Sequence, residues 1–257
     1  NLITSQSWKE IIDNKIKSQR KVRILFHYVP GPRTATTTKT YGGVIRVPAD
    51  TRGIRFRVPS SEVLKIFYGL TGALTQKVAW GKCSNNGQTC IAPDYILVQE
   101  NVLDTFVDEL KEAITGAYGE QIKDNPDYGR VVNIAHTKRI KGLLDDGLVN
   151  DGEVVFGGEI NVDERYIGPS LVVGKKGSEK FLSSRLMQEE IFGPVLPIIT
   201  YRETHEAIAH INAQPKPLAL YVFSENKVTT NTIIQKTSSG GVCINENVIH
   251  FLHGNLP

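Results

Sequence analysis

The chain has 257 residues, of which 40% are hydrophobic and 22% are charged, with 23 Gly and 12 Pro. This composition is typical of an ordinary globular protein and excludes a largely disordered or low-complexity chain. No stretch approaches the roughly 18 consecutive apolar residues that a membrane-spanning helix needs. The N-terminus also lacks the basic-then-apolar pattern of a secretory signal.

The chain contains three cysteines, Cys83, Cys90 and Cys243. Their odd number and their spacing match neither a disulfide framework nor a zinc site, so we expect no metal site. Unpaired cysteines indicate a reducing compartment, and we expect a cytoplasmic protein in which one thiol is a candidate for chemistry. Because the chain opens with Asn1 and its one methionine is Met187, we expect a fragment or a processed product.

The charge is divided unevenly along the chain. Residues 1–77 carry 14 Lys and Arg against 4 Asp and Glu, whereas residues 78–257 carry 16 against 23. A basic N-terminal segment can indicate contact with nucleic acid or an anionic membrane. Here the positive charges are scattered among Thr, Gly and Pro and do not gather on one helical face. This pattern favours short strands and turns, and we expect no nucleic-acid partner.

Regular patterning begins near residue 73, after a first apolar run at VRILFHYV (residues 22–29) that predicts a buried strand. Val102, Phe106, Leu110 and Ile114 recur every four residues and predict an amphipathic helix. The alternation of helices and strands predicts an α/β domain with a largely parallel sheet and flanking helices. The expected helices are 73–82, 101–119, 135–150, 203–214 and 228–237, and the expected strands are 92–99, 152–158, 170–174, 194–201, 218–224 and 239–249.

Cys90 lies between a polar loop, SNNGQT, and the strand segment IAPDYILV. A free cysteine is most often a small buried residue, and that reading stays open for Cys90 on local sequence alone. The alternative is a nucleophile displayed on a polar loop that a rigid strand anchors, which is a common arrangement for reactive side chains. Cys83 and Cys243 are expected to be packing residues.

Three ordered stretches bear a resemblance to one family. GQTCIAPDYILV (87–98) resembles the active-site segment of the aldehyde dehydrogenase superfamily, and its Ala-Pro-Asp-Tyr continuation resembles the class 3, fatty-aldehyde branch. QEEIFGPVLPI (188–198) resembles the family's Glu-Ile-Phe-Gly-Pro element. KPLALYVFS (216–224) with SSGGVCINENVIHFLHGNLP (238–257) resembles its late catalytic strands and closing motif. The resemblance covers roughly residues 75–257.

The resemblance implies a role for each of three residues. Cys90 would attack an aldehyde carbonyl as a thiolate, and the thiohemiacetal would pass hydride to nicotinamide C4 and leave a thioester for water to hydrolyse. The Cys90 backbone N–H would help to hold the oxyanion. Glu190 would accept hydrogen bonds from the nicotinamide ribose, and Phe192 would pack beside that ribose and ring. The implied cofactor is NAD, with NADP as the alternative, and the implied substrate is a medium- or long-chain aliphatic aldehyde.

The sequence suggests weaker candidates at two histidines and one glutamate. His250 and His253 either line the aldehyde tunnel or are ordinary surface or core histidines. Phe56 lies near the place where the family has its general-base glutamate, and Glu62, a few residues away, is a candidate to stand in for that base. No Gly-rich phosphate loop occurs in residues 1–77.

These departures set the expected domain organisation. We expect residues 1–77 to be an atypical basic segment in the place of the cofactor-binding domain, so that the Rossmann-like part is incomplete. Residues 78–257 would be the catalytic domain, truncated at its C-terminus. Intact members of this class are commonly homodimers, and a membrane contact would need a tail that these residues lack.

Three hypotheses follow. The first is an NAD(P)-dependent aldehyde dehydrogenase. The second is an inactive fragment or pseudoenzyme of that family, which lacks a complete cofactor site and general base. The third is a basic-tailed interaction protein, which would bind nucleic acid or anionic lipid in a strongly salt-dependent way.

Overall fold

The computed structural model describes residues 23–26 and 74–252. Within these described ranges the sheet has seven strands in the order β3-β6-β7-β2-β1-β8-β9, and every neighbouring pair is parallel except β3 with β6. The strands are β1 Arg23–Phe26, β2 Tyr95–Gln99, β3 Gly152–Phe156, β6 Ser170–Gly174, β7 Val195–Tyr201, β8 Ala219–Phe223 and β9 Gly241–Ile244. The prediction of an α/β fold with a largely parallel sheet is confirmed.

Helices connect the parallel strands, as crossover connections require. The α-helices are α3 Leu74–Cys83, α4 Leu103–Tyr118, α5 Ile134–Val149, α6 Glu179–Ser183, α7 Arg185–Gln188, α8 Thr204–Asn212 and α9 Lys227–Lys236. Short 3₁₀ turns occupy η1 Ser84–Gly87, η2 Glu100–Val102, η3 Ile122–Asp124 and η4 Ile249–Leu252. A separate two-stranded hairpin pairs β4 Ile160–Asn161 with β5 Tyr166–Ile167.

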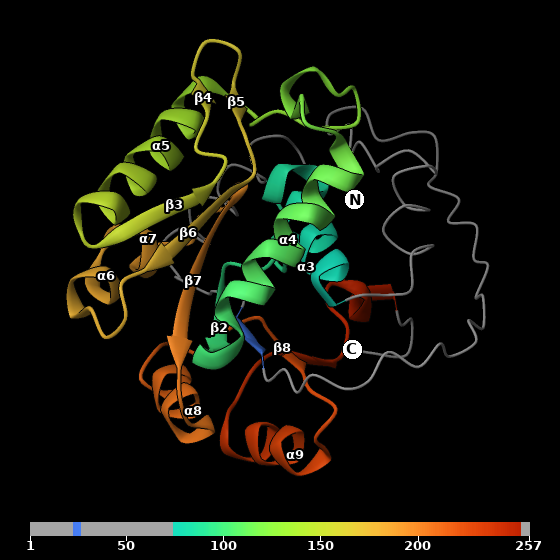
Figure 1. Cartoon of the computed structure of the whole chain (residues 1–257), viewed down its shortest axis with the longest axis vertical. Helices are drawn as coiled ribbons and strands as arrows, with labels where there is room; N and C mark the ends of the chain where they lie inside the picture. Colours follow the sequence, from blue (N-terminus) through green and yellow to red (C-terminus); the bar gives the residue numbers. More distant parts are fainter. Residues whose placement is uncertain (1–22, 27–73, 253–257) are drawn as a thin grey trace, which may run out of the picture.

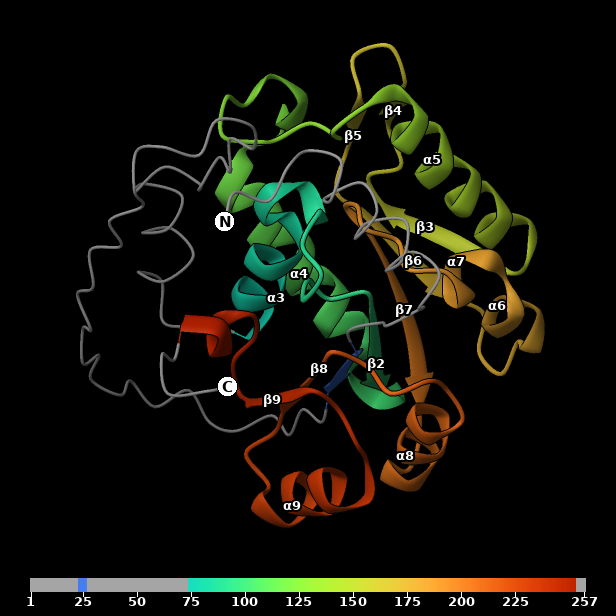
Figure 2. The ribbon, with the colours of Figure 1, turned by 180° about the vertical axis from the view of Figure 1, so that it is seen from behind.

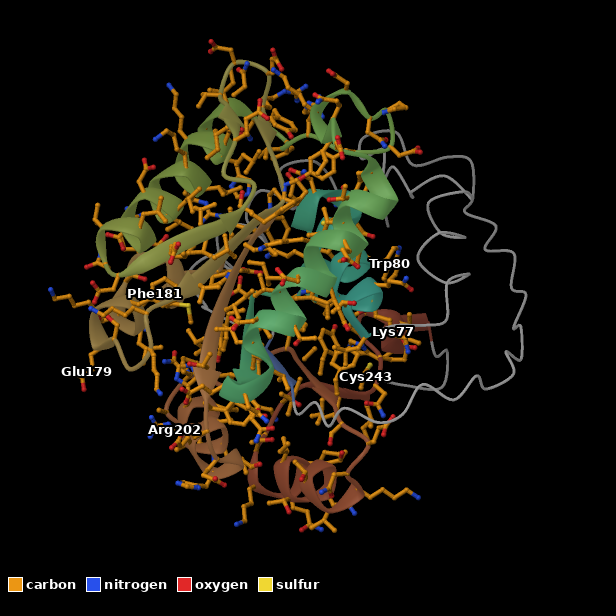
Figure 3. All side chains as sticks on the ribbon, in the orientation of Figure 1. Lys77, Trp80, Glu179, Phe181, Arg202 and Cys243 are labelled. Carbon is orange, nitrogen blue, oxygen red and sulfur yellow. The ribbon has the colours of Figure 1, made fainter. Side chains whose placement is uncertain are left out.

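Local sequence explains where several helices begin and end. The Asn133 side chain accepts a hydrogen bond from the His136 N–H and caps the start of α5, and Asn226 caps α9 in the same way. Helix α4 ends at Gly119, whose positive φ of 76° suits a residue without a Cβ. In α6, Phe181 points inward and is buried while Glu179 points into solvent, as Figure 3 shows.

The core lies on both faces of the sheet because alternate strand residues point to opposite sides. Ile96 and Val98 of β2 pack with α3 and α4, whereas Tyr95 and Leu97 pack with α5, α8 and α9. Figures 1 and 2 show α5 on one side of the sheet and α3 with α4 on the other. The fold is therefore a three-layer α/β/α arrangement that holds the strand ends and their loops in fixed positions.

Strand β1 comes from the basic N-terminal segment and lies inside the sheet. Its backbone pairs in parallel with β2 on one side and with β8 on the other. The expected boundary at residue 77 falls within α3, and the role expected for residues 1–77 as a whole concerns mainly residues outside the described ones. None of the helices in the described part of the chain combines the length and the apolar character that a bilayer crossing requires.

Candidate active site

The loop before Cys90 has a backbone that few residue types accept. Asn85 and Asn86 both adopt left-handed conformations, with φ of 51° and 57°, which asparagine tolerates better than most residues. Gly87 follows with φ of 70°, and a Cβ built on it would lie 2.3 Å from the Gly193 carbonyl oxygen. Glycine at 87 therefore allows this loop to approach the segment that contains Glu190 and Phe192.

Gln88 attaches the loop to a second, distant segment. Its amide N–H₂ donates to the Arg130 carbonyl at 3.1 Å, and its amide oxygen accepts from the Val132 N–H at 2.8 Å. The Asn85 side chain also donates to the Gln88 carbonyl at 2.9 Å. Both sides of the Gln88 amide are thus used, and the loop is held two residues before Cys90.

Cys90 is the exposed cysteine of the three, whereas Cys83 and Cys243 are buried. Burial raises the pKa of the Cys83 thiol to about 12, partly offset by the neighbouring Lys82 ammonium. Burial also raises the pKa of Cys243. The expectation that Cys83 and Cys243 are packing residues is confirmed, and Cys90 is the thiol that can reach an external molecule.

One pocket brings together the residues that the sequence indicated. Cys90, Glu190 and Phe192 all line it, although Cys90 and Glu190 are 100 residues apart in sequence. The pocket is completed by Lys82, Gly87, Thr89, Ala92, Pro93 and Asp94. The structure thus places the three candidate residues in one place, while their chemical roles stay predictions.

Two buried side chains, those of Lys82 and Asp94, tie the segment after Cys90 to its neighbours around the pocket. Lys82 is 3% exposed and donates to the Pro93 carbonyl at 2.8 Å, which ties α3 to the segment after Cys90. Asp94 is 4% exposed and accepts from the Ile191 N–H at 2.9 Å, which ties that segment to residues 190–192. Tyr221 of β8 donates to the Ile91 carbonyl at 2.8 Å from a third direction.

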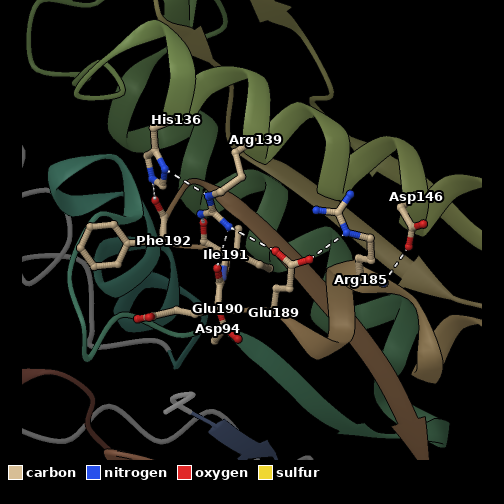
Figure 4. Close-up of polar contacts among 9 residues, drawn as sticks. All are labelled: Asp94, His136, Arg139, Asp146, Arg185, Glu189, Glu190, Ile191 and Phe192. Atoms are coloured by element: carbon tan, nitrogen blue, oxygen red, sulfur yellow. Dashed lines mark hydrogen bonds and ion pairs between the residues drawn. The ribbon is translucent and has the colours of Figure 1, made fainter. Parts of the chain in front are cut away.

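Two side chains of helix α5 contact the backbone carbonyl groups of residues 190–192. Arg139 donates to the Glu190 carbonyl at 3.1 Å and to the Ile191 carbonyl, and His136 contacts the Phe192 carbonyl through Nε2 at 2.9 Å. Figure 4 shows the Glu190 carboxylate and the Phe192 ring projecting away from this contact, on the side opposite to Glu189. Glu189 instead accepts from Arg185 Nε at 2.7 Å and lies 3.9 Å from Arg139.

The remaining sequence candidates lie elsewhere. His250 packs against the Tyr221 ring at 5.8 Å between centroids and does not line the pocket. His253, Glu62 and Phe56 lie outside the described residues. Sequence reasoning missed Gln88, His136 and Arg139, because each acts through carbonyl groups more than 40 residues away in the chain.

Comparison with known proteins identifies the family. Residues 71–255, which are more than half of the chain, match the aldehyde dehydrogenase family. The chain belongs to the aldehyde dehydrogenase family. The resemblance inferred from the three sequence motifs is thereby confirmed, and the family match begins just before α3.

Two curated aldehyde dehydrogenases illustrate the relationship. The chain is 45% identical over 183 residues to 4,4'-diaponeurosporen-aldehyde dehydrogenase of Staphylococcus aureus, covering 71% of this chain and 38% of that protein. It is 44% identical over 182 residues to aldehyde dehydrogenase family 3 member A2 of Rattus norvegicus, covering 71% of this chain and 36% of that protein. The chain thus spans little more than a third of the length of these relatives.

The solved structures agree with the family assignment. A substrate-bound aldehyde dehydrogenase of Staphylococcus aureus matches with a TM-score of 0.71 and 32% identity, covering 98% of this chain and 47% of that one. An indole-3-acetaldehyde dehydrogenase in complex with NAD⁺ matches with a TM-score of 0.61 at 22% identity, covering 88% of this chain and 38% of that one, and this likeness shows the fold alone.

Proposed function

We propose that the protein oxidises aldehydes to carboxylic acids with NAD⁺ or NADP⁺, and that Cys90 is the nucleophile. The observation that carries this proposal is the pocket itself, where an exposed thiol, a carboxylate and an aromatic ring from distant parts of the chain meet. Membership of the aldehyde dehydrogenase family supports the reaction class.

The covalent chemistry follows from the properties of a thiolate. The Cys90 sulfur forms a bond to the carbonyl carbon, and the carbonyl π electrons move to oxygen, where the Cys90 backbone N–H donates to the developing charge. Loss of hydride from that carbon, which NAD⁺ or NADP⁺ would accept when bound, gives a thioester. Water then adds to the thioester, and the thiolate leaves as the acid is released. Thiolate suits both steps because it is a strong nucleophile and a good leaving group.

The residues of the pocket fit the nicotinamide end of the cofactor. The Glu190 carboxylate, which has only acceptor oxygens when ionised, matches the two hydroxyl donors of a ribose. The Phe192 ring offers an apolar face against which the ribose and a planar ring can pack. When bound, the cofactor supplies the hydride acceptor. Arg139 and His136 hold the backbone of both residues, so their side chains start from fixed positions.

The substrate class and the partner are inferred from relatives. The Staphylococcus aureus relative is named for an aldehyde of diaponeurosporene, and the family 3 relatives agree with the class 3 branch that the sequence resembles and from which fatty aldehydes were inferred. A medium- or long-chain aldehyde is therefore our proposed substrate. Another relative from Rattus norvegicus is named as dimeric and NADP-preferring, at 44% identity, which supports a homodimer and keeps NADP⁺ as an alternative cofactor.

A product assay tests the reaction. Folded protein is incubated with a medium-chain aldehyde and either NAD⁺ or NADP⁺, and the carboxylic acid and the reduced cofactor are quantified together. Equal amounts of the two products, absent with Cys90→Ala, would support the proposal. Neither product from folded wild-type protein would reject it, and a reactive Cys90 in that protein would then favour the pseudoenzyme hypothesis.

A further inference from the structure

Phe192 has an unusual backbone conformation for an aromatic residue. Its φ is 50°, in the left-handed region that side chains with a Cβ rarely adopt, and this costs roughly 1 kcal/mol or more. A residue in such a conformation keeps it only when surrounding contacts oppose relaxation. The carbonyl of this strained residue accepts a hydrogen bond from His136, at 2.9 Å from Nε2.

The contacts of His136 determine its tautomer. Arg139 Nε lies 3.2 Å from His136 Nδ1 and donates to it, because a guanidinium has no acceptor. Nδ1 must therefore carry a lone pair. The proton of the neutral ring is then on Nε2, where it is donated to the Phe192 carbonyl. The ring thus acts as acceptor and donor at once, as only the neutral Nε2–H form can.

His136 and Arg139 together contact three consecutive carbonyl groups, those of residues 190, 191 and 192. We call these two side chains the α5 clamp. Adding a proton to His136 places an N–H on Nδ1 against the Arg139 N–H, with two positive charges side by side. One of the two side chains must then move, and hydrogen bonds to the 190–192 carbonyls are lost with it.

The charged groups around the α5 clamp come from several elements. Arg139 faces His136 from its own helix, and Arg139 also interacts with Glu189 and Glu190 from the pocket segment, Asp94 from the segment after Cys90 and Arg185 from α7. Burial lowers the pKa of His136 below its ordinary value, and Arg139 adds to this although the Phe192 carbonyl opposes it. The neutral ring is therefore the form present near neutral pH.

We propose that His136 is a positioning residue for cofactor binding, and that its neutral Nε2–H form holds Glu190 and Phe192 in the conformation that receives the nicotinamide end. The proposal rests on the proposed function for its ligand. It adds that binding weakens when His136 takes up a proton, and that an amide at this position keeps the contacts without the pH dependence. Gln offers both an acceptor oxygen and a donor N–H₂, whereas Ala offers neither.

A first experiment uses the protein without ligand. Nitrogen NMR of histidine-labelled protein reports which ring nitrogen carries the proton, and the carbonyl carbon of Phe192 is followed in the same pH titration. We expect the Nε2–H tautomer, and a Phe192 carbonyl shift whose midpoint coincides with that of His136. The Nδ1–H tautomer, or a Phe192 carbonyl that does not respond when His136 titrates, would overturn the proposal.

A second experiment measures NAD⁺ and NADP⁺ affinity by calorimetry between about pH 8 and about pH 5, around the ordinary histidine pKa of about 6.5. We expect the affinity of the wild type for the cofactor to fall by at least about fivefold toward acid pH, because hydrogen bonds that hold the pocket segment are lost. His136→Gln should bind well across the range with a flat profile, and His136→Ala should bind weakly throughout. His205→Gln, on the exposed surface of α8, is the matched control and should keep the wild-type profile.

The outcomes separate the two proposals. The positioning role would be overturned if the affinity of His136→Gln fell toward acid pH as the wild-type affinity does, or if His136→Ala bound the cofactor with wild-type affinity. Either result would leave the proposed function intact. If folded wild-type protein binds neither NAD⁺ nor NADP⁺ at any pH, the proposed function fails. The NMR titration then tests the α5 clamp by itself. A common midpoint for His136 and the Phe192 carbonyl carbon supports the clamp, and different midpoints overturn it.

Discussion

At the scale of single residues, Cys83 and Cys90 lie seven positions apart and differ in the two properties that control thiol reactivity. Cys90 is exposed in the pocket, whereas Cys83 is 2% exposed at the end of α3. Reactivity requires access and a thiolate, and burial removes both from Cys83 because the charged form is poorly solvated there. Position in the fold therefore separates two thiols that are close in sequence.

This difference predicts selective alkylation. Iodoacetamide at about pH 8, near the ordinary thiol pKa, should modify Cys90 while leaving Cys83 and Cys243 unmodified in the native protein. Peptide mass spectrometry after brief exposure measures this, and unfolded protein, in which all three should react, is the control. Faster modification of Cys83 than of Cys90 would mean that the described packing of α3 is wrong.

The same burial predicts an alkaline loss of stability. Burial raises the pKa of the Cys83 thiol to about 12 in the folded chain, whereas its ordinary pKa, which an unfolded chain would show, is 9.0. The contribution of the protonated Cys83 to the free energy of unfolding should therefore be fully present below about pH 9, and it should be lost as the pH rises toward 12. Urea unfolding of wild type and Cys83→Ser at several pH values measures it. The variant should lose less stability over this window, because the hydroxyl does not titrate there.

At the scale of elements, the Cys90 loop and the Glu190–Phe192 segment approach each other where glycine leaves room. The Gly87 position combines a positive φ with a backbone carbonyl where a Cβ would be. A carbonyl cannot move aside as the end of a flexible side chain can. The contact between these two segments therefore depends on residue 87 having no side chain.

We expect Gly87→Ala to destabilise the protein by at least about 2 kcal/mol and to lower activity, because the strained backbone and the blocked contact act together. Gly116→Ala is the matched control. Gly116 lies in α4 with nothing within 4 Å of a built Cβ, and alanine there should stabilise by about 0.5–1 kcal/mol. Urea unfolding measures both, and equal effects of the two changes would contradict the described geometry.

Sequence patterns predicted the longer elements well, because apolar spacing in residues 101–119 or 218–224 records which face is buried. They did not predict α6, α7 or the β4–β5 hairpin, which have two to five residues per element and no measurable period. The antiparallel pairing of β3 with β6 was not predicted either, because apolar spacing within a strand does not indicate its direction relative to its neighbour. The motif residues were found by resemblance, whereas Gln88 and His136 were missed because their partners are distant in sequence.

At the scale of the whole molecule, β1 is the strand that residues 23–26 contribute to the sheet of the family-matched region. It lies between β2 and β8, so without it two strands that are buried inside the sheet would lose their hydrogen-bonding neighbour. Unpaired strand edges of this kind promote aggregation. Residues 23–26 of the basic segment and the strands of the family-matched region therefore lie in one sheet.

This arrangement predicts that residues 74–257 alone do not form a stable soluble protein. Size-exclusion chromatography and circular dichroism should show aggregation or loss of cooperative unfolding. In the full chain, Leu25→Pro should have a similar effect, since proline has no backbone N–H to donate within a central strand. A truncated chain that unfolds cooperatively with full stability would contradict the place of β1 in the sheet.

The most direct test of the central claim is to identify the covalent intermediate. The protein is mixed with a medium-chain aldehyde and NAD⁺, quenched rapidly in acid, digested and analysed by mass spectrometry. We predict an acyl group on the peptide that contains Cys90, dependent on NAD⁺ and absent from Cys90→Ala. Reduced cofactor formed without any acyl group on Cys90, an acyl group on another residue, or no reaction from folded protein would contradict the account.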